Sequence, residues 1–213
     1  MIMGDICTRT CRFCATKSGK PLPLDPTEPQ KLAESIQLMK LKHCVITSVD
    51  RDDLLDKGAN HWKETVSKVK ELNPNTIIEL LIPDYNEEQL SIVCQGEPDI
   101  IAHNLETVKR LTPSIRSKAT YEKSIDTLKG IVKTGKVCKT GIMVGLGETK
   151  EEVVELLHEV KAIGCQMITI GQYLQPTLDN IEVMEYVTPE TFEFYKNIAI
   201  ELGDRKSNTS ELQ

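Results

Sequence analysis

Short apolar runs alternate with amphipathic stretches along nearly the whole chain. The runs are rich in β-branched residues and almost continuously apolar, which is typical of parallel strands covered on both faces. We expect strands at residues 1–3, 44–49, 77–82, 100–102, 141–144 and 167–170.

A helical pattern follows each of these runs, with recognisable start and stop signals. Thr188 before Pro189 favours the start of the last helix, and Pro74 is expected to end the helix that contains Trp62. A Ser/Thr followed three residues later by Glu/Gln predicts a capping box, and this pattern occurs at Thr27 with Gln30 and at Thr149 with Glu152.

Six consecutive βα units predict a parallel sheet with right-handed crossovers. Six units are too few for a closed eight-stranded barrel, so we predict an α/β fold, a partial (β/α)6 TIM-like barrel, over residues 1–203. An open doubly wound sheet is the alternative. Residues 204–213 are polar without apolar periodicity, and we expect them to form a disordered tail.

Composition excludes several classes of protein. A net charge of −6 argues against a nucleic-acid partner. No apolar run approaches the roughly 20 residues that span a bilayer, so we expect no membrane partner. The first residues lack the features of a signal peptide. A cytoplasmic protein is therefore expected, and a mitochondrial one only if a preceding segment carried a transit peptide.

Seven cysteines cannot all pair within one chain, and three of them crowd into one loop. Cys7, Cys11 and Cys14 follow the first predicted strand, whereas the other four are scattered in apolar segments. Thiolates suit zinc or iron–sulfur clusters. Zinc normally takes four ligands, so three thiolates favour a [4Fe–4S] cluster that leaves one iron open for a substrate.

The sequence around this Cys-x3-Cys-x2-Cys loop resembles the lipoyl synthase family of the radical S-adenosylmethionine superfamily. The resemblance extends over nearly the whole chain to about Leu202, and similar blocks follow successive predicted strands. The blocks are Met3-Gly4-Asp5-Ile6-Cys7-Thr8-Arg9, Ile46-Thr47-Ser48-Val49-Asp50-Arg51-Asp52-Asp53, His103-Asn104-Leu105-Glu106-Thr107, Met143-Val144-Gly145-Leu146-Gly147-Glu148-Thr149 and Thr169-Ile170-Gly171-Gln172-Tyr173-Leu174-Gln175-Pro176.

The resemblance implies a radical-generating site with assigned residues. Cys7, Cys11 and Cys14 would hold the [4Fe–4S] cluster, and S-adenosylmethionine would bind beside it. Ser48 and Asp50 would contact its methionine end, Asn104 and Glu106 its ribose, Arg116 its carboxylate, and Gly141, Gly145, Gly147, Gln172 and Tyr173 its adenine. Strand-end turns, a helix cap, an exposed arginine and a core tyrosine are the alternatives. His103 is a further possible site residue.

The implied reaction is sulfur insertion at C6 and C8 of an octanoyl chain on a lysine of a lipoyl carrier domain. Carriers would be 2-oxoacid dehydrogenase acyltransferase subunits or the glycine-cleavage H protein, and a flavodoxin or ferredoxin would supply electrons. The resemblance also implies an auxiliary [4Fe–4S] cluster as the sulfur donor. Its Cys-x4-Cys-x5-Cys and Arg-Ser-Ser-Tyr motifs are not found here. A truncated or divergent enzyme that only cleaves S-adenosylmethionine, or a non-catalytic metal-binding module, is therefore the alternative.

Overall fold

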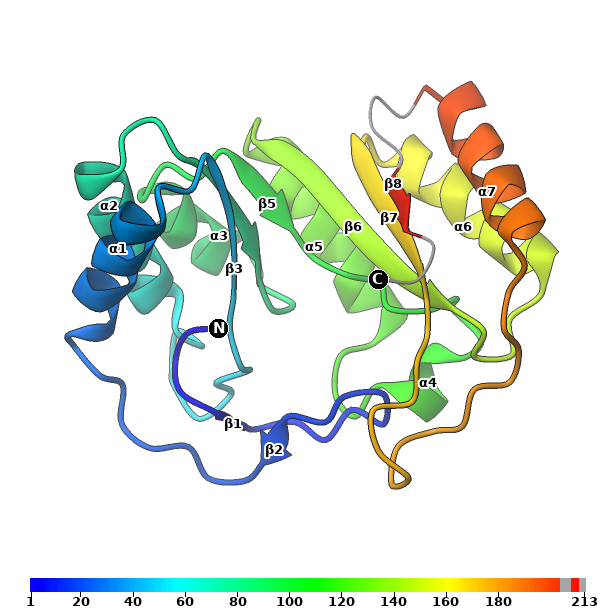
Figure 1. Ribbon diagram of the computed structural model, residues 1–213, viewed down its shortest axis with the longest axis horizontal. Helices are drawn as coiled ribbons and strands as arrows, with labels where there is room; N and C mark the ends of the chain where they lie inside the picture. Colours follow the sequence, from blue (N-terminus) through cyan, green and yellow to red (C-terminus); the bar gives the residue numbers. More distant parts are fainter. Residues whose placement is uncertain (204–207, 211–213) are drawn as a thin grey trace.

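A curled parallel sheet organises the computed structural model, which describes residues 1–203 and the backbone of 208–210 (Figure 1). Within this part of the chain the main sheet has six strands in the order β3-β4-β5-β6-β7-β8, and β1 pairs separately with β2. The strands are β1 Ile6–Cys7, β2 Lys17–Ser18, β3 His43–Thr47, β4 Ile77–Leu81, β5 Ile100–Ala102, β6 Val137–Val144, β7 Met167–Gln172 and β8 Asn208–Ser210.

Helices connect the strands and lie along the outer side of the sheet (Figure 1). They are α1 Glu28–Met39, α2 Ala59–Leu72, α3 Glu87–Cys94, α4 Thr112–Ile115, α5 Tyr121–Lys133, α6 Lys150–Ala162 and α7 Pro189–Glu201. The succession of parallel strands and crossover helices confirms the predicted partial barrel. It also overturns the alternative of a doubly wound sheet with helices on both faces.

The two faces of the sheet differ in burial. Side chains of a strand alternate between faces, and Ile78 and Leu80 of β4 are 0% exposed beneath the helices. On the inner face, Val45 of β3 is 55% exposed and Ile77 of β4 is 47% exposed. The hydrophobic core therefore lies between the sheet and the helices, and the inner face of the half barrel stays accessible.

Both ends of the sheet differ from the prediction. The expected strand at residues 1–3 is reduced to one parallel bridge between Ile2 and Ser48. At the other end, Asn208–Ser210 forms β8 beside β7, so the expected disordered tail is wrong for these three residues. An edge strand offers unpaired backbone groups to any extended segment. A segment that pairs through its backbone does not need alternating apolar side chains. Residues 204–207 and 211–213 of that predicted tail lie outside the described residues.

One of the two predicted capping boxes forms. Thr149 accepts from the backbone N–H of Glu152, and the Glu152 carboxylate accepts from the Thr149 N–H. Thr27 instead adopts helical backbone angles and makes no side-chain cap. Its hydroxyl donates to Asp25 at 2.6 Å. The Thr27 prediction is wrong because a cap needs an extended backbone at that residue.

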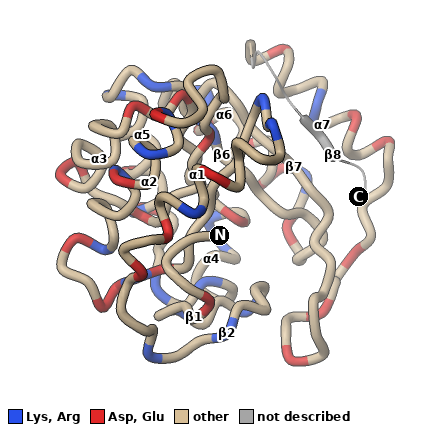
Figure 2. Tube along the Cα trace, turned by 60° about the vertical axis from the view of Figure 1, so that its left-hand side comes forward, with Lys and Arg blue, Asp and Glu red and all other residues tan. Residues whose placement is uncertain are grey.

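Charged residues are dispersed over the helical layer. Figure 2 shows Lys and Arg interspersed with Asp and Glu around α2, α3 and α5. None of the helices in the described part of the chain combines the length and apolar character needed to cross a membrane.

Candidate functional site

A cavity of about 330 Å³ opens where the parallel strands end. The segment that carries β1 and β2 passes along this edge of the sheet (Figure 1). Loops after parallel strands are the usual place for chemistry in barrels of this type. The predicted site residues that line the cavity are Cys7, Cys11, Cys14, Ser48, Asp50, His103, Asn104, Glu106 and Arg116.

The three cysteines enter the cavity from one loop with different exposure. Cys7 is buried, Cys11 is half-buried and Cys14 is exposed. The backbone N–H of Arg9 donates to Cys7 Sγ at 3.4 Å, and that of Thr16 donates to Cys14 Sγ at 3.4 Å. Hydrogen bonds of this kind stabilise sulfur that carries negative charge. Burial raises the pKa of the Cys7 thiol.

Cys7, Cys11 and Cys14 line one cavity. A zinc ion requires every sulfur ligand within about 2.3 Å of one point. In the described part of the chain, no three His, Cys, Asp or Glu side chains gather closely enough to hold one metal ion. Three thiols that nevertheless line one cavity are the donor set for a [4Fe–4S] cluster with one iron left without a protein thiolate.

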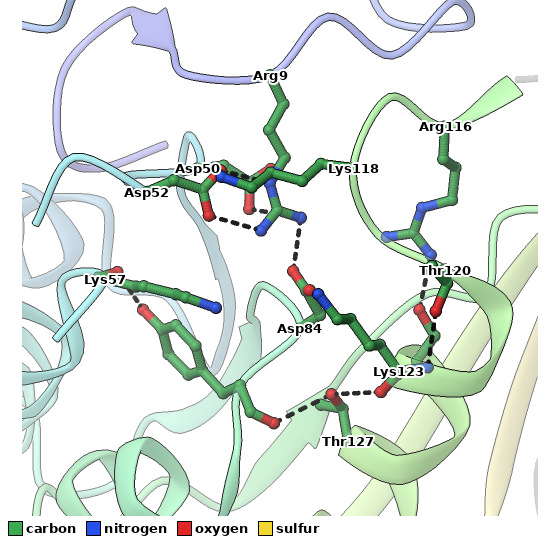
Figure 3. Close-up of polar contacts among 12 residues, drawn as sticks. Arg9, Asp50, Asp52, Lys57, Asp84, Arg116, Lys118, Thr120, Lys123 and Thr127 are labelled. Atoms are coloured by element: carbon green, nitrogen blue, oxygen red, sulfur yellow. Dashed lines mark hydrogen bonds and ion pairs between the residues drawn. The ribbon is translucent and has the colours of Figure 1, made fainter. Parts of the chain in front are cut away.

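A buried arginine joins the cysteine loop to the strand ends. Arg9 donates to both carboxylate oxygens of Asp52, at 2.8 and 2.9 Å. It also pairs with Asp84 at 2.5 Å and with Asp50 at 3.4 Å (Figure 3). The hydrogen bonds from Arg9 hold the pKa of Asp52 well below its usual range, and Lys118 adds a second cation 3.3 Å from Asp52.

Ser48 and Asp50 follow β3 on the same wall of the cavity. The Ser48 hydroxyl oxygen is buried and has no hydrogen-bond partner among the described residues. Burial raises the pKa of Asp50, although Arg9 opposes the shift. A buried hydroxyl without a partner costs free energy, so Ser48 is suited to a polar ligand that completes its bonding.

Asn104 and Glu106 follow β5, and the backbone of Glu106 is hydrogen-bonded to β6. The Glu106 N–H donates to Gly141 O at 3.1 Å, and Glu106 O accepts from Met143 N at 2.8 Å. Glu106 has a φ of 68°, a conformation that is uncommon outside glycine and is often found at functional sites. Burial raises the pKa of Glu106.

Gly141 of β6 lies beside the Asn104 side chain. A Cβ at this position would stand 2.8 Å from Asn104 Oδ1, so the missing side chain makes room for the Asn104 amide. Gly141 itself is not among the residues that line the cavity. A contact of Gly141 with adenine stays a prediction.

Arg116 reaches the cavity from the C-cap of α4. Its Nη1 donates to Ser124 Oγ at 2.8 Å and to Asn104 O at 3.2 Å. His103 is buried behind it, with Nε2 2.9 Å from Ser124 Oγ. Burial lowers the pKa of His103 to about 4, so this imidazole is neutral at pH 7.

The remaining residues expected at adenine have other contacts. Gln172 donates to Glu185 O at 3.0 Å and accepts from Val187 N at 2.8 Å. Tyr173 is buried and donates to Ile181 O at 2.8 Å. A Cβ at Gly145 would strike Gln172, and Gly147 has a φ of 102° in the turn before α6. None of the four lines the cavity.

Sequence reasoning missed three residues that shape this site. Arg9 stood in a quoted block, but its carboxylate partners come from two later loops. Asp84 and Ser124 lie outside every quoted block, and neither carries a motif. A charged residue inside a cysteine loop, which has to be neutralised when the loop is buried, was the only available signal.

Comparison with known proteins decides the family. The radical SAM superfamily model matches residues 1–160. A lipoyl synthase of Parabacteroides distasonis is 56% identical over 215 residues, which cover 100% of this chain and 76% of the relative. A lipoyl synthase of Treponema denticola is 52% identical and covers 95% of this chain and 71% of the relative. The chain belongs to the lipoyl synthase family. The resemblance found in the sequence is thereby confirmed.

Solved structures agree with the fold of this lipoyl synthase family member. The FeFe-hydrogenase maturase HydG from Carboxydothermus hydrogenoformans has a TM-score of 0.80 at 11% identity and covers 100% of this chain and 53% of its own. Streptococcus suis SuiB bound to S-adenosylmethionine has a TM-score of 0.79 at 12% identity, with 100% and 50% covered. At such identities the likeness shows the partial barrel alone. Family membership identifies a [4Fe–4S] cluster and S-adenosylmethionine as the cofactors.

Proposed function

We propose that this chain uses S-adenosylmethionine to insert sulfur into an octanoyl chain, producing the lipoyl group. One observation carries the proposal: three cysteines of one loop line the same cavity as a hydroxyl, an amide, two carboxylates and a guanidinium. Relatives at 56% and 52% identity are lipoyl synthases. Together they favour a radical S-adenosylmethionine sulfurtransferase over a metal-binding module.

In this proposal Cys7, Cys11 and Cys14 bind three irons of the cluster. When bound, the cluster and S-adenosylmethionine supply the radical that removes hydrogen from an unactivated carbon. The residues of the chain bind and orient these groups. Arg9 fixes the cysteine loop against Asp52 and keeps the thiols in the cavity.

The polar wall of the cavity provides the proposed contacts to S-adenosylmethionine. Ser48 and Asp50 would bind the methionine amino group, and Arg116 would pair with the carboxylate through its planar fork. Asn104 and Glu106 would accept hydrogen bonds from the ribose hydroxyls. We also keep the prediction that four residues after β6 and β7 contact adenine: Gly145, Gly147, Gln172 and Tyr173.

The proposed substrate is octanoyl-lysine on a lipoyl carrier domain. Carriers of this chemistry are the acyltransferase subunits of 2-oxoacid dehydrogenases and the glycine-cleavage H protein. The electron would come from a small redox protein such as flavodoxin or ferredoxin. The named relatives are bacterial, and a cytoplasmic location is part of the proposal.

Anaerobic reconstitution with iron and sulfide tests the proposal. We expect about four irons per chain at this site. We expect 5′-deoxyadenosine after addition of dithionite and S-adenosylmethionine. When a second iron–sulfur cluster that can donate sulfur is also supplied, we expect a lipoylated carrier peptide by mass spectrometry. Cys11→Ala should abolish 5′-deoxyadenosine, whereas Cys44→Ala, which alters a half-buried thiol on β3, should not.

The outcomes separate the competing functions. Cleavage of S-adenosylmethionine without lipoyl product would support the alternative of an enzyme that does not insert sulfur. Bound zinc, or a cluster that never cleaves S-adenosylmethionine, would contradict the enzymatic function.

A further inference from the structure

A continuous hydrogen-bond chain leads from the β4 end through the core to the cavity. Arg116 Nη1 donates to Ser124 Oγ at 2.8 Å, and Ser124 Oγ lies 2.9 Å from His103 Nε2. His103 Nδ1 lies 2.9 Å from the Ile82 carbonyl oxygen. Four segments of the chain therefore meet through three polar side chains, and Figure 3 shows the Arg116 end of this chain above α5.

The direction of each hydrogen bond is fixed by chemistry. A carbonyl oxygen only accepts, so the Ile82 carbonyl requires the proton on His103 Nδ1. His103 Nε2 is then an acceptor and receives a hydrogen bond from the Ser124 hydroxyl. Because its one hydroxyl hydrogen points to the imidazole, Ser124 Oγ acts as an acceptor toward Arg116, which only donates. The low pKa of His103, caused by burial, keeps the imidazole in this neutral form.

The Arg116 guanidinium has one donor without a hydrogen-bond partner among the described residues. Its Nε has no hydrogen-bond partner among the described residues and is buried, although Arg116 lines the cavity. A guanidinium held on one side by a serine and a backbone carbonyl presents its remaining donors in a fixed plane. That plane matches a carboxylate.

We propose that Ser124 and His103 are positioning residues that hold the Arg116 guanidinium in the plane required by the carboxylate of the methionine moiety. This inference rests on the proposed use of S-adenosylmethionine. The proposed role requires no contact of either residue with the cofactor. Ser124 acts on Arg116 by accepting a hydrogen bond from Nη1, and His103 acts on Ser124 by accepting a hydrogen bond from its hydroxyl.

A neighbouring hydroxyl on the same helix provides a matched control. Thr127 lies one turn from Ser124 on α5 and is also buried. Its hydroxyl donates to Tyr85 O at 3.0 Å and to Lys123 O at 2.9 Å, and neither acceptor belongs to the chain that leads to Arg116. Ser124→Ala and Thr127→Val each remove one buried hydroxyl from α5, but only the first breaks the chain to Arg116.

The test compares S-adenosylmethionine with its decarboxylated analogue, which lacks the proposed partner of Arg116. Dissociation constants are measured by anaerobic equilibrium dialysis on the reconstituted protein. Loss of one charge-assisted hydrogen bond corresponds to roughly tenfold in affinity. We expect Ser124→Ala to raise the Kd for S-adenosylmethionine by about this factor and to leave the Kd for the analogue unchanged. Thr127→Val should leave both unchanged.

Three further variants separate positioning from folding. Ser124→Thr keeps the hydroxyl and should restore the preference for the carboxylate. Arg116→Ala should lose the preference, and adding Ser124→Ala to it should cause no further loss, because both act on one interaction. The thermal midpoint of every variant is measured in parallel.

The negative outcomes are distinct. Equal weakening of both ligands by Ser124→Ala, or the same effect from Thr127→Val, would overturn the positioning role while leaving the proposed function intact. A wild-type protein that carries its cluster but binds neither ligand would overturn the proposed function, and the inference with it.

Discussion

Arg9 and Asp52 form a two-pronged ion pair, with Nε to Oδ2 at 2.8 Å and Nη2 to Oδ1 at 2.9 Å. This pair joins a residue between two cysteines of the cluster loop to the loop that follows β3. Arg9 is 5% exposed, and its Nη1 also meets the buried Asp84. The Arg9 guanidinium is therefore a buried link between the cysteine loop and the two loops that carry Asp52 and Asp84.

Replacing Arg9 should disorder the cysteine loop. Arg9→Ala leaves Asp52 and Asp84 without their main cation, and breaking a buried pair in this way costs about 3–5 kcal/mol. We expect that loss in the free energy of urea unfolding of the metal-free protein. Iron bound per chain after reconstitution should fall as well. Arg9→Lys should recover only part of both, because an ammonium cannot make the two-pronged contact.

Arg12 offers a control on the same loop. It is exposed and donates one hydrogen bond, from Nη1 to Ser114 O at 3.2 Å. Arg12→Ala should change the unfolding free energy by no more than about 0.5 kcal/mol. Equal losses in the Arg9 and Arg12 variants would show that the buried carboxylates do not depend on Arg9.

Gly141 should be needed for the position of Asn104. The Cβ of Gly141→Ala would stand 2.8 Å from Asn104 Oδ1, so the amide has to move. Loss of one hydrogen bond to S-adenosylmethionine would raise its Kd roughly tenfold, measured by anaerobic titration calorimetry. In an Asn104→Ala background the same substitution should have no further effect, because the clashing atom is gone.

Gly130→Ala is the control for Gly141→Ala, because it disturbs packing in the core and not the cavity. A Cβ at Gly130 in α5 would stand 2.6 Å from Leu90 Cδ1, in the core. This variant should lower the thermal midpoint and leave the Kd unchanged. An unchanged Kd in Gly141→Ala as well would remove the link between Gly141 and Asn104.

The strands that form the middle of the sheet could be predicted because each needs a run of apolar residues to cover the core. Ile78 and Leu80 of β4 and Ile168 and Ile170 of β7 are such residues, all nearly fully buried. Asn208–Ser210 could not be predicted this way. Pairing of β8 with β7 uses backbone groups, and backbone hydrogen bonds leave no pattern in the side chains.

For the site, blocks at strand ends could be predicted, whereas contacts between distant loops could not. Ser48, Asn104 and the cysteines line one cavity because parallel strands end at a common edge. Gln172 stands at an equivalent strand end. Its amide is held by Glu185 and Val187 of a returning loop, which only the folded chain reveals.

Replacing Tyr173 by Phe tests whether the Tyr173 hydroxyl has a structural role or takes part in adenine binding. Its hydroxyl donates to Ile181 O at 2.8 Å, and its ring packs with Ile115 and Leu146. Tyr173→Phe should lower the unfolding free energy by about 1 kcal/mol and leave the Kd for S-adenosylmethionine unchanged. Tyr186→Phe, at a side chain that is 69% exposed, should change neither quantity. A raised Kd in Tyr173→Phe would instead favour adenine binding.

His103 should make stability depend on pH in a defined window. An unfolded histidine has a pKa of 6.5, and burial lowers the pKa of His103 to about 4 in the folded protein. Between these values the unfolded chain binds more protons, so acid favours unfolding. The free energy of unfolding should therefore fall as pH decreases through this window, by up to about 3 kcal/mol from this residue.

His103→Gln removes the titrating group while an amide can still accept from Ser124. Urea unfolding of the metal-free protein at several pH values between about 4 and 7 should give a shallower slope in this variant than in the wild type. Titrating groups that do not interact with His103 are common to both proteins, so the difference between the slopes reports His103 together with its interaction with Asp84. His158→Gln changes an exposed histidine of α6 and should keep the wild-type slope. Parallel slopes in all three proteins would mean that His103 is protonated equally in the folded and unfolded chains.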